Sequence, residues 1–368
     1  MIRTIYIFAN FGNFKELPLG GGQSSARRTM DTLRKMGYNV VPIVRHRSVH
    51  LGKISHKLEV LSFALIDIFK ILSKTITGNR DNAIFFHLTY SGSLLPYEYI
   101  LAKMMHIMGY RNFMYLQGGR TNRLYYNGST FYKNLFKKTM DLHEEVMFEG
   151  MENLKLVQSI SNIKTFYFPN YTEDGFNPET LPIKPKGVIN ICYVGRIQAV
   201  KNVLIGIETY NILCKKYHNI HYTIIGGGRK NDDYEERVIK AINESPHKKN
   251  ITKLPRSSHA VIKEILKSQH IYLFPSNESV EGHSNALNEA MAWGCVPVIS
   301  NNNYLPDIVD DPNLVVYDFK PESYAKKIEE IIETMDIEQL SKKMYERVKN
   351  NFIQSVVEKN LCENLKQF

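Results

Sequence analysis

Short apolar segments alternate with stretches of helical periodicity along nearly the whole chain. Helical crossovers join the strands of a parallel sheet, so this alternation predicts α/β units with helices on both faces of such a sheet. No fixed-period repeat is present, which argues against a solenoid. The predicted strands are TIYIFA, NVVPIV, AIFFHLT, NFMYLQ, EVMFE, KTFYFP, VINICYVG, HYTIIGGG, NITKLP, HIYLFP, CVPVIS and NLVVYD.

A segment rich in proline and polar residues, 169–187, interrupts the alternation and indicates a linker. A chain of 368 residues exceeds the usual size of one hydrophobic core, so two domains are expected. We predict two Rossmann-like, doubly wound parallel-sheet domains, 1–172 and 188–340, that face each other across a cleft. Residues 173–187 join them, and a helix in 341–368 crosses back to the first domain. Such sheets bind ligands at the carboxyl ends of their strands.

Positive charge is concentrated in the first half of the chain. The formal net charge is +10, and residues 1–170 carry 22 lysines and arginines against 11 acidic residues. A solvated basic face, an anionic membrane surface and nucleic acid are the open interpretations. Basic residues are not interleaved with aromatic ones as in RNA-binding proteins, so we expect no nucleic acid partner.

The segment 46–80 favours the membrane interpretation. Apolar residues recur there at helical spacing among basic residues, as in helices that lie in a membrane interface. The chain shows no apolar run of about 18 residues and no signal-peptide pattern, so we expect a cytoplasmic protein, peripheral on the inner membrane, with four free thiols. The apolar positions are Leu58, Leu61, Leu65, Phe69 and Leu72, and the basic ones are Lys53, Lys57, Lys70, Lys74 and Arg80.

A glycine loop follows the first predicted strand. The glycines at 20–22 precede a helix that Ser24 or Ser25 can cap. A glycine loop before a helix N-terminus suits an anion, but a plain flexible turn explains the pattern equally well.

Two further loops follow strands of the second half. Gly195 ends a strand, and Arg196 and Lys201 follow it before the next helix. These cations suit a diphosphate, although surface cations are common. The glycines at 226–228 follow the next strand and allow a ligand to approach the backbone.

The segment 276–295 holds three glutamates beside an apolar strand. Ser284 is the predicted N-cap of a helix that ends near Gly294. The amides of 282–285 would then lie at a helix N-terminus, where phosphate binds well. The helix dipole alone explains Glu281 there, but it explains Glu289 less well. Glu278 is interpreted as decoration of the loop.

These residues carry a resemblance to a known family. YVGRIQAVKNV followed by LFPSNESVEGHSNALNEAMAWGCVPVIS resembles the C-terminal domain of the family 4 retaining glycosyltransferases of the GT-B fold. That family has two glutamates with seven residues between them, and Glu281 and Glu289 have this spacing. GGGQSSARRTMDTLRKMGYNV is similar to the family's N-terminal glycine loop and helix.

The resemblance implies roles for particular residues. Arg196 and Lys201 would hold the donor diphosphate, Glu289 the ribose hydroxyls and Glu281 the donor sugar, with Glu281, Arg196 and Lys201 taking part in catalysis. Family members generally need no metal, and no D-x-D pair is present here, so no metal or cofactor is expected. The implied donor site is Gly195, Arg196, Lys201, Gly227, Pro255, Arg256, Glu281, Gly282, His283, Ser284, Asn285 and Glu289, and the implied acceptor side is Gly21, Gly22, Gln117, Gly118 and Arg120.

The implied reaction transfers a hexosyl group from a nucleotide-sugar, with UDP-sugars favoured, to a hydroxyl of a glycan or lipid-linked acceptor in polysaccharide biosynthesis. The anomeric configuration would be retained. The chain departs from the family at Gln117, where many members have histidine. A sugar-nucleotide epimerase of related fold and a noncatalytic nucleotide-sugar or membrane-binding protein are the alternatives.

Overall fold

The chain folds into two compact units in a computed structural model. The structure describes residues 3–16, 21–46, 54–89, 92, 94–229, 232–279 and 281–367, except for the side chains of 54–61. Unit 1 comprises Met1–Pro169 and Glu358–Phe368, and unit 2 comprises Asn170–Val357. In the described part of the chain, no helix has the length and apolar character needed to span a membrane.

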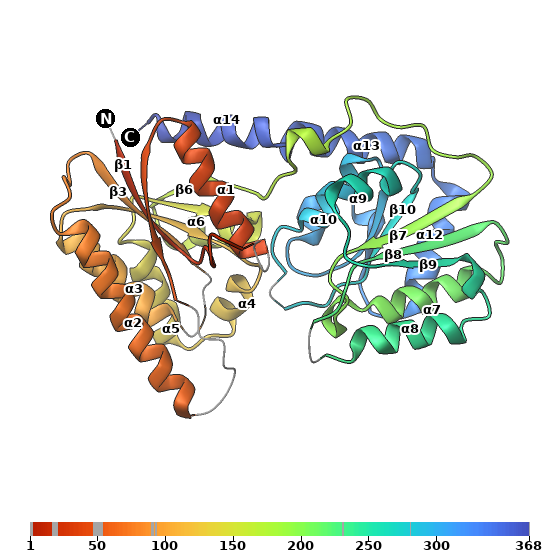
Figure 1. Ribbon diagram of the computed structural model, residues 1–368, viewed down its shortest axis with the longest axis horizontal. Helices are drawn as coiled ribbons and strands as arrows, with labels where there is room; N and C mark the ends of the chain where they lie inside the picture. The colour runs from red at the N-terminus through yellow and green to blue at the C-terminus, as the bar shows by residue number, and fades with distance from the viewer. Residues whose placement is uncertain are drawn as a thin grey trace. The chain divides into compact units, whose positions relative to one another are not determined.

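Unit 1 is built on a parallel sheet of six strands in the order β2-β1-β3-β4-β5-β6 (Figure 1). The chain first moves from β1 to β2 and then returns to the other side of β1 for β3, so the sheet is doubly wound. The strands are β1 (Thr4–Ala9), β2 (Asn39–Val44), β3 (Ala83–Thr89), β4 (Arg111–Leu116), β5 (Glu145–Phe148) and β6 (Lys164–Tyr167).

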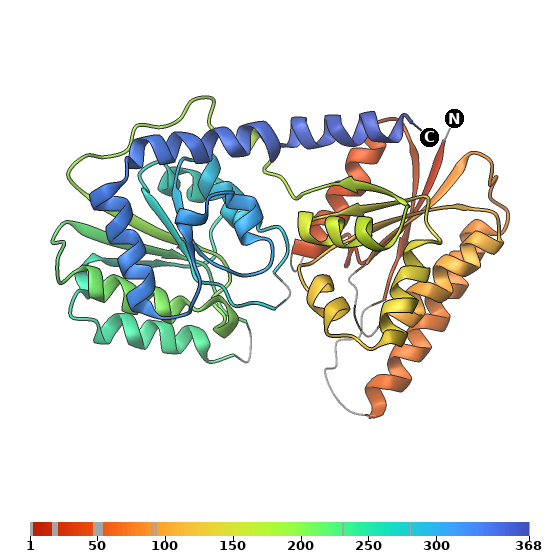
Figure 2. The ribbon, with the colours of Figure 1, turned by 180° about the vertical axis from the view of Figure 1, so that it is seen from behind.

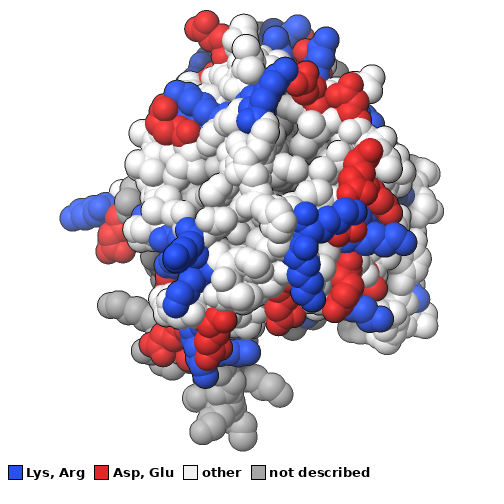
Figure 3. Space-filling view, turned by 90° about the vertical axis from the view of Figure 1, so that its right-hand side faces the viewer, with Lys and Arg blue, Asp and Glu red and all other residues white. Residues whose placement is uncertain are grey.

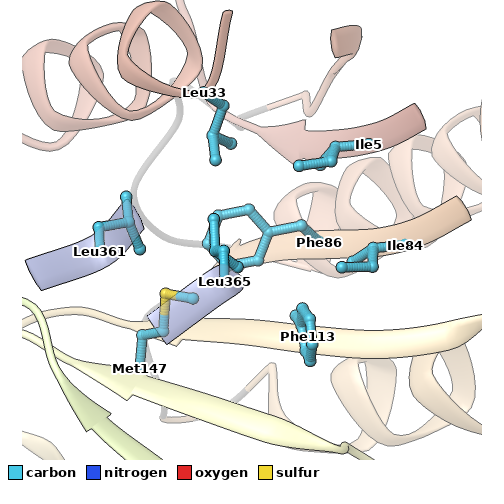
Figure 4. Close-up of a pocket in the computed structure, with 8 residues that line it drawn as sticks. All are labelled: Ile5, Leu33, Ile84, Phe86, Phe113, Met147, Leu361 and Leu365. Carbon is cyan, nitrogen blue, oxygen red and sulfur yellow. The ribbon is translucent and has the colours of Figure 1, made fainter. Parts of the chain in front are cut away.

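Helices cover both faces of this sheet (Figures 1 and 2). Successive strand residues point to opposite faces. On one face, Phe86 of β3 packs near Leu33 and Leu361 from two helices (Figure 4), and on the other Phe85 packs with Ile71. The helices of the first segment are α1 (Gly21–Lys35), α2 (Ile54–Thr75), α3 (Leu95–Ile107), α4 (Thr121–Tyr126), α5 (Thr130–Met140) and α6 (Met151–Ile160).

Unit 2 repeats this plan with the strand order β12-β11-β10-β7-β8-β9. The chain builds one half of the sheet from β7 outward and then crosses to the other side of β7 to build the second half. The direction of winding therefore changes between β7 and β10. The strands are β7 (Ile189–Val194), β8 (Ile220–Ile225), β9 (Ile251–Leu254), β10 (Ile271–Phe274), β11 (Val296–Ser300) and β12 (Val315–Val316).

Helices also flank the second sheet. Its α-helices are α7 (Val203–Leu213), α8 (Tyr234–Glu244), α9 (His259–Leu266), α10 (Asn285–Ala292), α11 (Leu305–Val309), α12 (Pro321–Thr334) and α13 (Ile337–Asn351), and its 3-10 turns are η1 (Asp174–Phe176), η2 (Ala199–Lys201), η3 (Lys248–Asn250) and η4 (Pro312–Leu314). Helix α14 (Gln354–Leu365) begins in unit 2 and ends in unit 1. Figure 3 shows the face at the right of Figure 1, where basic and acidic side chains are interspersed.

The predicted doubly wound parallel sheets are confirmed, and all twelve predicted strands are present. Two segments can be compared with the predicted boundaries. Phe176, in the segment predicted to be a linker, is buried and packs edge-on against Trp293 at 6.2 Å between ring centroids. The last helical stretch is two helices, α13 and α14, and between them Ile353 forms a parallel β-bridge with Thr172.

Candidate active site

Two loops of unit 2 meet where the winding of its sheet changes direction. The loop after β7 and the loop after β10 leave neighbouring strands and lead to different parts of the sheet, an arrangement that opens a crevice at the carboxyl ends of the strands. The Asn277 backbone N–H donates to the Val200 carbonyl at 2.8 Å, and the Asn202 side-chain amide donates to the Pro275 carbonyl at 2.9 Å. These bonds hold the predicted cations and glutamates close together.

Glycines allow the loops after β7 and β8 to touch. Gly195 N–H donates to the Ile225 carbonyl at 3.0 Å, and Ile197 N–H donates to the Gly227 carbonyl at 3.0 Å. Gly226 has φ +153°, and a Cβ there would overlap the Gly195 carbonyl oxygen. Only glycine permits this approach. Gly227 borders open space, since the nearest atoms to a Cβ there, including Arg256 Cβ, are 4.0 Å away.

Lys201 and Glu281 form a buried ion pair between these two loops. Their side chains are 6% and 9% exposed, and Lys201 Nζ contacts Glu281 Oε2. Ser276 Oγ donates to the same carboxylate oxygen at 2.6 Å, and Nζ lies 5.2 Å from the centroid of the Phe274 ring. A charge that is buried this deeply needs a partner. The structure therefore places Glu281, the first glutamate of the motif, in contact with Lys201.

Glu278 belongs to the same cluster, and the interpretation of this residue as loop decoration is wrong. Its carboxylate lies 2.6 Å from Lys201 Nζ, and Arg196 Nη2 donates to its two oxygens at 3.0 and 3.2 Å. Burial acts to raise the pKa of Glu278, but Lys201 and Arg196 hold that pKa below its usual value. Glu278 is therefore an anion at neutral pH. Its place in the same loop as Glu281 was the available sequence signal.

The helix that follows this loop begins as predicted. Ser284 is the N-cap of α10 and accepts a hydrogen bond from the Leu287 backbone N–H at 3.4 Å. His283 is buried, its carbonyl accepts from the Asn170 side-chain amide at 2.9 Å, and its ring Nδ1 lies 3.2 Å from Asn288 Nδ2. The His283 side chain thus anchors the helix start within unit 2. The N-terminal amides of an eight-residue helix remain suited to an anion.

The remaining donor-side residues lie on α10 and near β9. Glu289 is in the second turn of α10, its side chain is 15% exposed, and it lies 3.8 Å from His259 Nε2. Pro255 and Arg256 are exposed in the turn after β9. Arg256 borders Gly227, so this turn and the glycine loop after β8 lie together.

Three of the five predicted acceptor-side residues, Gln117, Gly118 and Arg120, follow the carboxyl end of β4. Gln117 is buried, and its side-chain amide donates to Ser25 Oγ at 2.7 Å. Gly118 has φ +81°, and its N–H donates to Glu149 Oε2 at 2.7 Å. Arg120 is exposed at the start of α4. Gln117 is thus tied to the first helix of the unit.

The glycine loop of unit 1 differs from its prediction in one respect. Gly21 and Gly22 form the start of α1, and Gly20 lies outside the described residues. Ser24 and Ser25 are therefore inside the helix, and the expectation that one of them caps it is wrong. No pattern in the sequence linked Ser25 with Gln117. Among the residues described, no group of three or more histidine, cysteine or acidic side chains could hold a metal ion.

Solved structures share this architecture over its full length. Sucrose-phosphate synthase from Thermosynechococcus elongatus matches with a TM-score of 0.73 and 15% identity over 99% of this chain and 98% of that one. Anabaena Alr3699/HepE in complex with UDP matches with a TM-score of 0.71 and 10% identity over 100% of each chain. The fold is GT-B.

Sequence comparisons agree with this GT-B fold. Residues 180–351 match the family model described as glycosyl transferases group 1. One subunit of phosphatidylinositol N-acetylglucosaminyltransferase from Arabidopsis thaliana is 24% identical over 52% of this chain. The amylovoran biosynthesis glycosyltransferase AmsK from Erwinia amylovora is 29% identical over 38% of this chain. The matches span 42% and 36% of these two relatives. Together the comparisons support a glycosyltransferase with the GT-B fold.

Proposed function

We propose that this chain is a retaining glycosyltransferase of family 4 that moves a hexosyl group from a nucleotide-sugar to a hydroxyl of a glycan or lipid-linked acceptor. A UDP-sugar is the favoured donor, and cell-surface polysaccharide synthesis is the favoured setting. The observation that carries the proposal is the charged cluster before the N-terminus of α10, in which Lys201 pairs with Glu281 and Glu278 joins Lys201 to Arg196. The names of the two relatives and the UDP complex of a structural neighbour support it.

The cluster has the chemistry that donor cleavage requires. The bond between the anomeric carbon and the diphosphate oxygen breaks, and its electron pair stays on the diphosphate. Fixed cations and helix-terminal amides stabilise the charge where it develops. The acceptor oxygen forms the new bond on the same face of the sugar, and its proton passes to a donor phosphate oxygen. Glu281 is already bound to Lys201 and Ser276, so we assign it to positioning the donor sugar rather than to covalent attack.

A donor panel tests the proposal. Wild-type protein and Glu289→Ala are incubated with UDP-, GDP- and ADP-sugars, without added metal, and donor hydrolysis and transfer are measured. Glu289 would bind the ribose hydroxyls, so its loss is expected to weaken donor binding about 10- to 100-fold. Full activity of Glu289→Ala would contradict the site assignment, and an isomerised donor without transfer would indicate an epimerase.

We further propose that an anionic membrane surface is a partner, bound by the helices α2 and α3 of unit 1. These helices and the residue after α2 carry exposed apolar side chains, each between 53% and 74% exposed: Leu65, Phe69, Ile76, Ile100 and Ile107. Leu65 and Phe69 of α2 and Ile76 just after its end are spaced by four and seven residues, and Ile100 and Ile107 of α3 by seven, so each set forms one stripe. Leu72 of α2 lines one groove with Ile100 and Ile107 of α3, which joins the two helices.

Basic side chains accompany these apolar ones. Lys70 and Lys74 lie on α2, and Lys103 lines the groove between α2 and α3. Lysines beside apolar side chains suit an anionic lipid surface. Leu58 and Leu61 were part of the same prediction, as were Lys53 and Lys57, but their side chains lie outside the described residues.

Vesicle sedimentation tests the membrane partner. The double variant Phe69→Ser with Ile107→Ser is expected to bind anionic vesicles at least tenfold more weakly than wild type, because each apolar side chain contributes through burial. Ile183→Ser is the control, since Ile183 is 92% exposed in unit 2. Wild-type protein that shows no preference for anionic over neutral vesicles at low salt would refute this partner.

A further inference from the structure

The two phosphate-binding cations of the proposed site are already paired with an anion of the chain itself. We propose that the Glu278 carboxylate occupies the place of a donor phosphate on Arg196 and Lys201 and swings away when a diphosphate binds. This inference rests on the proposed function, because it concerns the same donor site. It makes Glu278 a competitor of the diphosphate group that sets the affinity for it.

The contacts of Glu278 are those that a phosphate would make. Both carboxylate oxygens accept from Arg196 Nη2, at 3.0 and 3.2 Å, and one also lies 2.6 Å from Lys201 Nζ. Arginine binds two oxygens of one anion, and lysine acts as a point charge, which is also how they bind phosphate. A carboxylate with two oxygens between these groups therefore mimics a ligand.

Glu278 and Glu281 are held differently. Among the described residues, the Glu278 carboxylate contacts only the two cations, whereas Glu281 also accepts a hydrogen bond from Ser276 Oγ at 2.6 Å. An anion that binds Arg196 and Lys201 would thus take both partners of the Glu278 carboxylate. Glu281 would keep its hydrogen bond from Ser276. Of the two carboxylates, Glu278 is the one that a ligand replaces.

The main chain around Glu278 is fixed, so only its side chain needs to move. The Glu278 carbonyl accepts from the side-chain amides of Asn302 at 3.2 Å and Asn303 at 3.0 Å. Lys201 is 6% exposed, Glu278 15% and Arg196 46%. The Glu278 carboxylate thus joins the buried lysine to the half-exposed arginine, and rotation of its side chain would release both cations.

The charge of Glu278 affects both the binding of the donor and the release of the nucleoside diphosphate. With Glu278 in place, two cations face two carboxylates, so their formal charges cancel. A diphosphate carries more negative charge than one carboxylate and can displace it, but it must compete. When the nucleoside diphosphate leaves after transfer, Glu278 returns to the cations. The residue thus lowers affinity for donor and product and favours product release.

Calorimetry with wild type, Glu278→Gln and Glu278→Ala tests the inference. The probes are inorganic pyrophosphate, UDP, GDP and ADP, with uridine as a probe that lacks phosphate. Both variants are expected to bind pyrophosphate, and any nucleoside diphosphate that wild type binds, about three- to tenfold more tightly, as expected for loss of a partly exposed ion pair. Binding of uridine should not change.

Glu333→Gln is the matched control. Glu333 pairs with Lys216 at 2.5 Å in unit 2, and its change removes one negative charge as Glu278→Gln does. Lys216 follows the C-terminus of α7, at the sheet edge opposite to the carboxyl ends of the strands. Tighter pyrophosphate binding by Glu333→Gln as well would attribute the gain to net charge and overturn the inference.

The outcomes separate this inference from the proposed function. Weaker binding by both Glu278 variants would show that Glu278 merely orients Arg196 and Lys201, and unchanged binding would show that it does not compete. Either result overturns the inference while wild-type nucleotide binding leaves the proposed donor site intact. Wild-type protein that binds none of the phosphate probes would instead overturn the donor site itself, and the inference with it.

Discussion

Units 1 and 2 each bury a cluster of charged side chains, and the two clusters differ in their exposure. In unit 1, Glu98 contacts Arg45, accepts from Thr89 Oγ1 at 2.7 Å and lies 3.2 Å from His87 Nδ1. Its side chain is 2% exposed, and those of His87 and Arg45 are 0% and 11% exposed. In unit 2, Arg196 is 46% exposed.

The cluster of unit 1 is closed. His143 Nδ1 donates to the Thr139 carbonyl at 2.7 Å, so its Nε2 accepts from His87 Nε2 at 2.7 Å. The other ring nitrogen of His87, Nδ1, faces Glu98 Oε2. A buried network whose groups satisfy one another stabilises a single conformation, whereas a cluster that ends on an exposed arginine can exchange a partner for a ligand. We therefore assign a stabilising role to the cluster of unit 1 and a ligand-binding role to the cluster of unit 2.

The largest expected difference is in stability. Glu98→Ala leaves Arg45 and His87 buried without their anion, so it is expected to lower the free energy of unfolding by about 3–5 kcal/mol. Glu278→Ala breaks a partly exposed pair and should cost less than about 1 kcal/mol. Denaturant unfolding measures both. Equal losses in the free energy of unfolding for the two variants would contradict the distinction between the two clusters.

The second largest expected effect is a loss of stability of unit 1 in acid. Burial opposes the charge of Glu98, but Arg45 and His87 outweigh it and lower its pKa to about 2 from the ordinary 4.5. Burial, with the help of His87, lowers the pKa of His143 to about 3 from 6.5. The unfolded chain therefore takes up protons first, at His143 below pH 6.5 and at Glu98 below 4.5, and stability falls as pH falls.

Hydrogen exchange of peptides from unit 1, between pH 7 and 2, measures this loss. The share due to Glu98 is about 3 kcal/mol once pH has fallen from 4.5 to 2. Glu98→Gln is the control, and it should remove the dependence below pH 4.5 while keeping the part due to His143. Stability of unit 1 that rises on acidification would contradict the closed-cluster assignment.

The smallest effects are expected for substitutions of one glycine in each unit. Gly226→Ala places a Cβ against the Gly195 carbonyl at φ +153° and is expected to cost about 1–3 kcal/mol and to weaken nucleotide binding. Gly21→Ala meets no atom within 4 Å in α1 and should change stability by less than about 0.5 kcal/mol. Thermal unfolding and UDP calorimetry of both variants check this. Similar losses would mean that close approach is not special to the loops of unit 2.

Periodicity and motif spacing predicted much of the molecule. Alternation of apolar runs located every strand, and Ser284 marked the start of α10, because both signals are local. The cap expected at Ser24 or Ser25 failed because Gly21 and Gly22 are part of the helix. The buried network of Glu98 and His87 left no local sign, since its members lie on different elements.

The sequence by itself determined that the chain forms doubly wound sheets and that Arg196, Lys201 and Glu281 occupy loops after strands, because hydrophobic period and loop position are properties of neighbouring residues. Only the tertiary structure decided which charges meet. Lys201 and Glu278 are far apart along the chain, and they touch because β7 and β10 are neighbours at the point where the sheet changes direction. A charge pair across a sheet depends on strand order, which no single segment encodes.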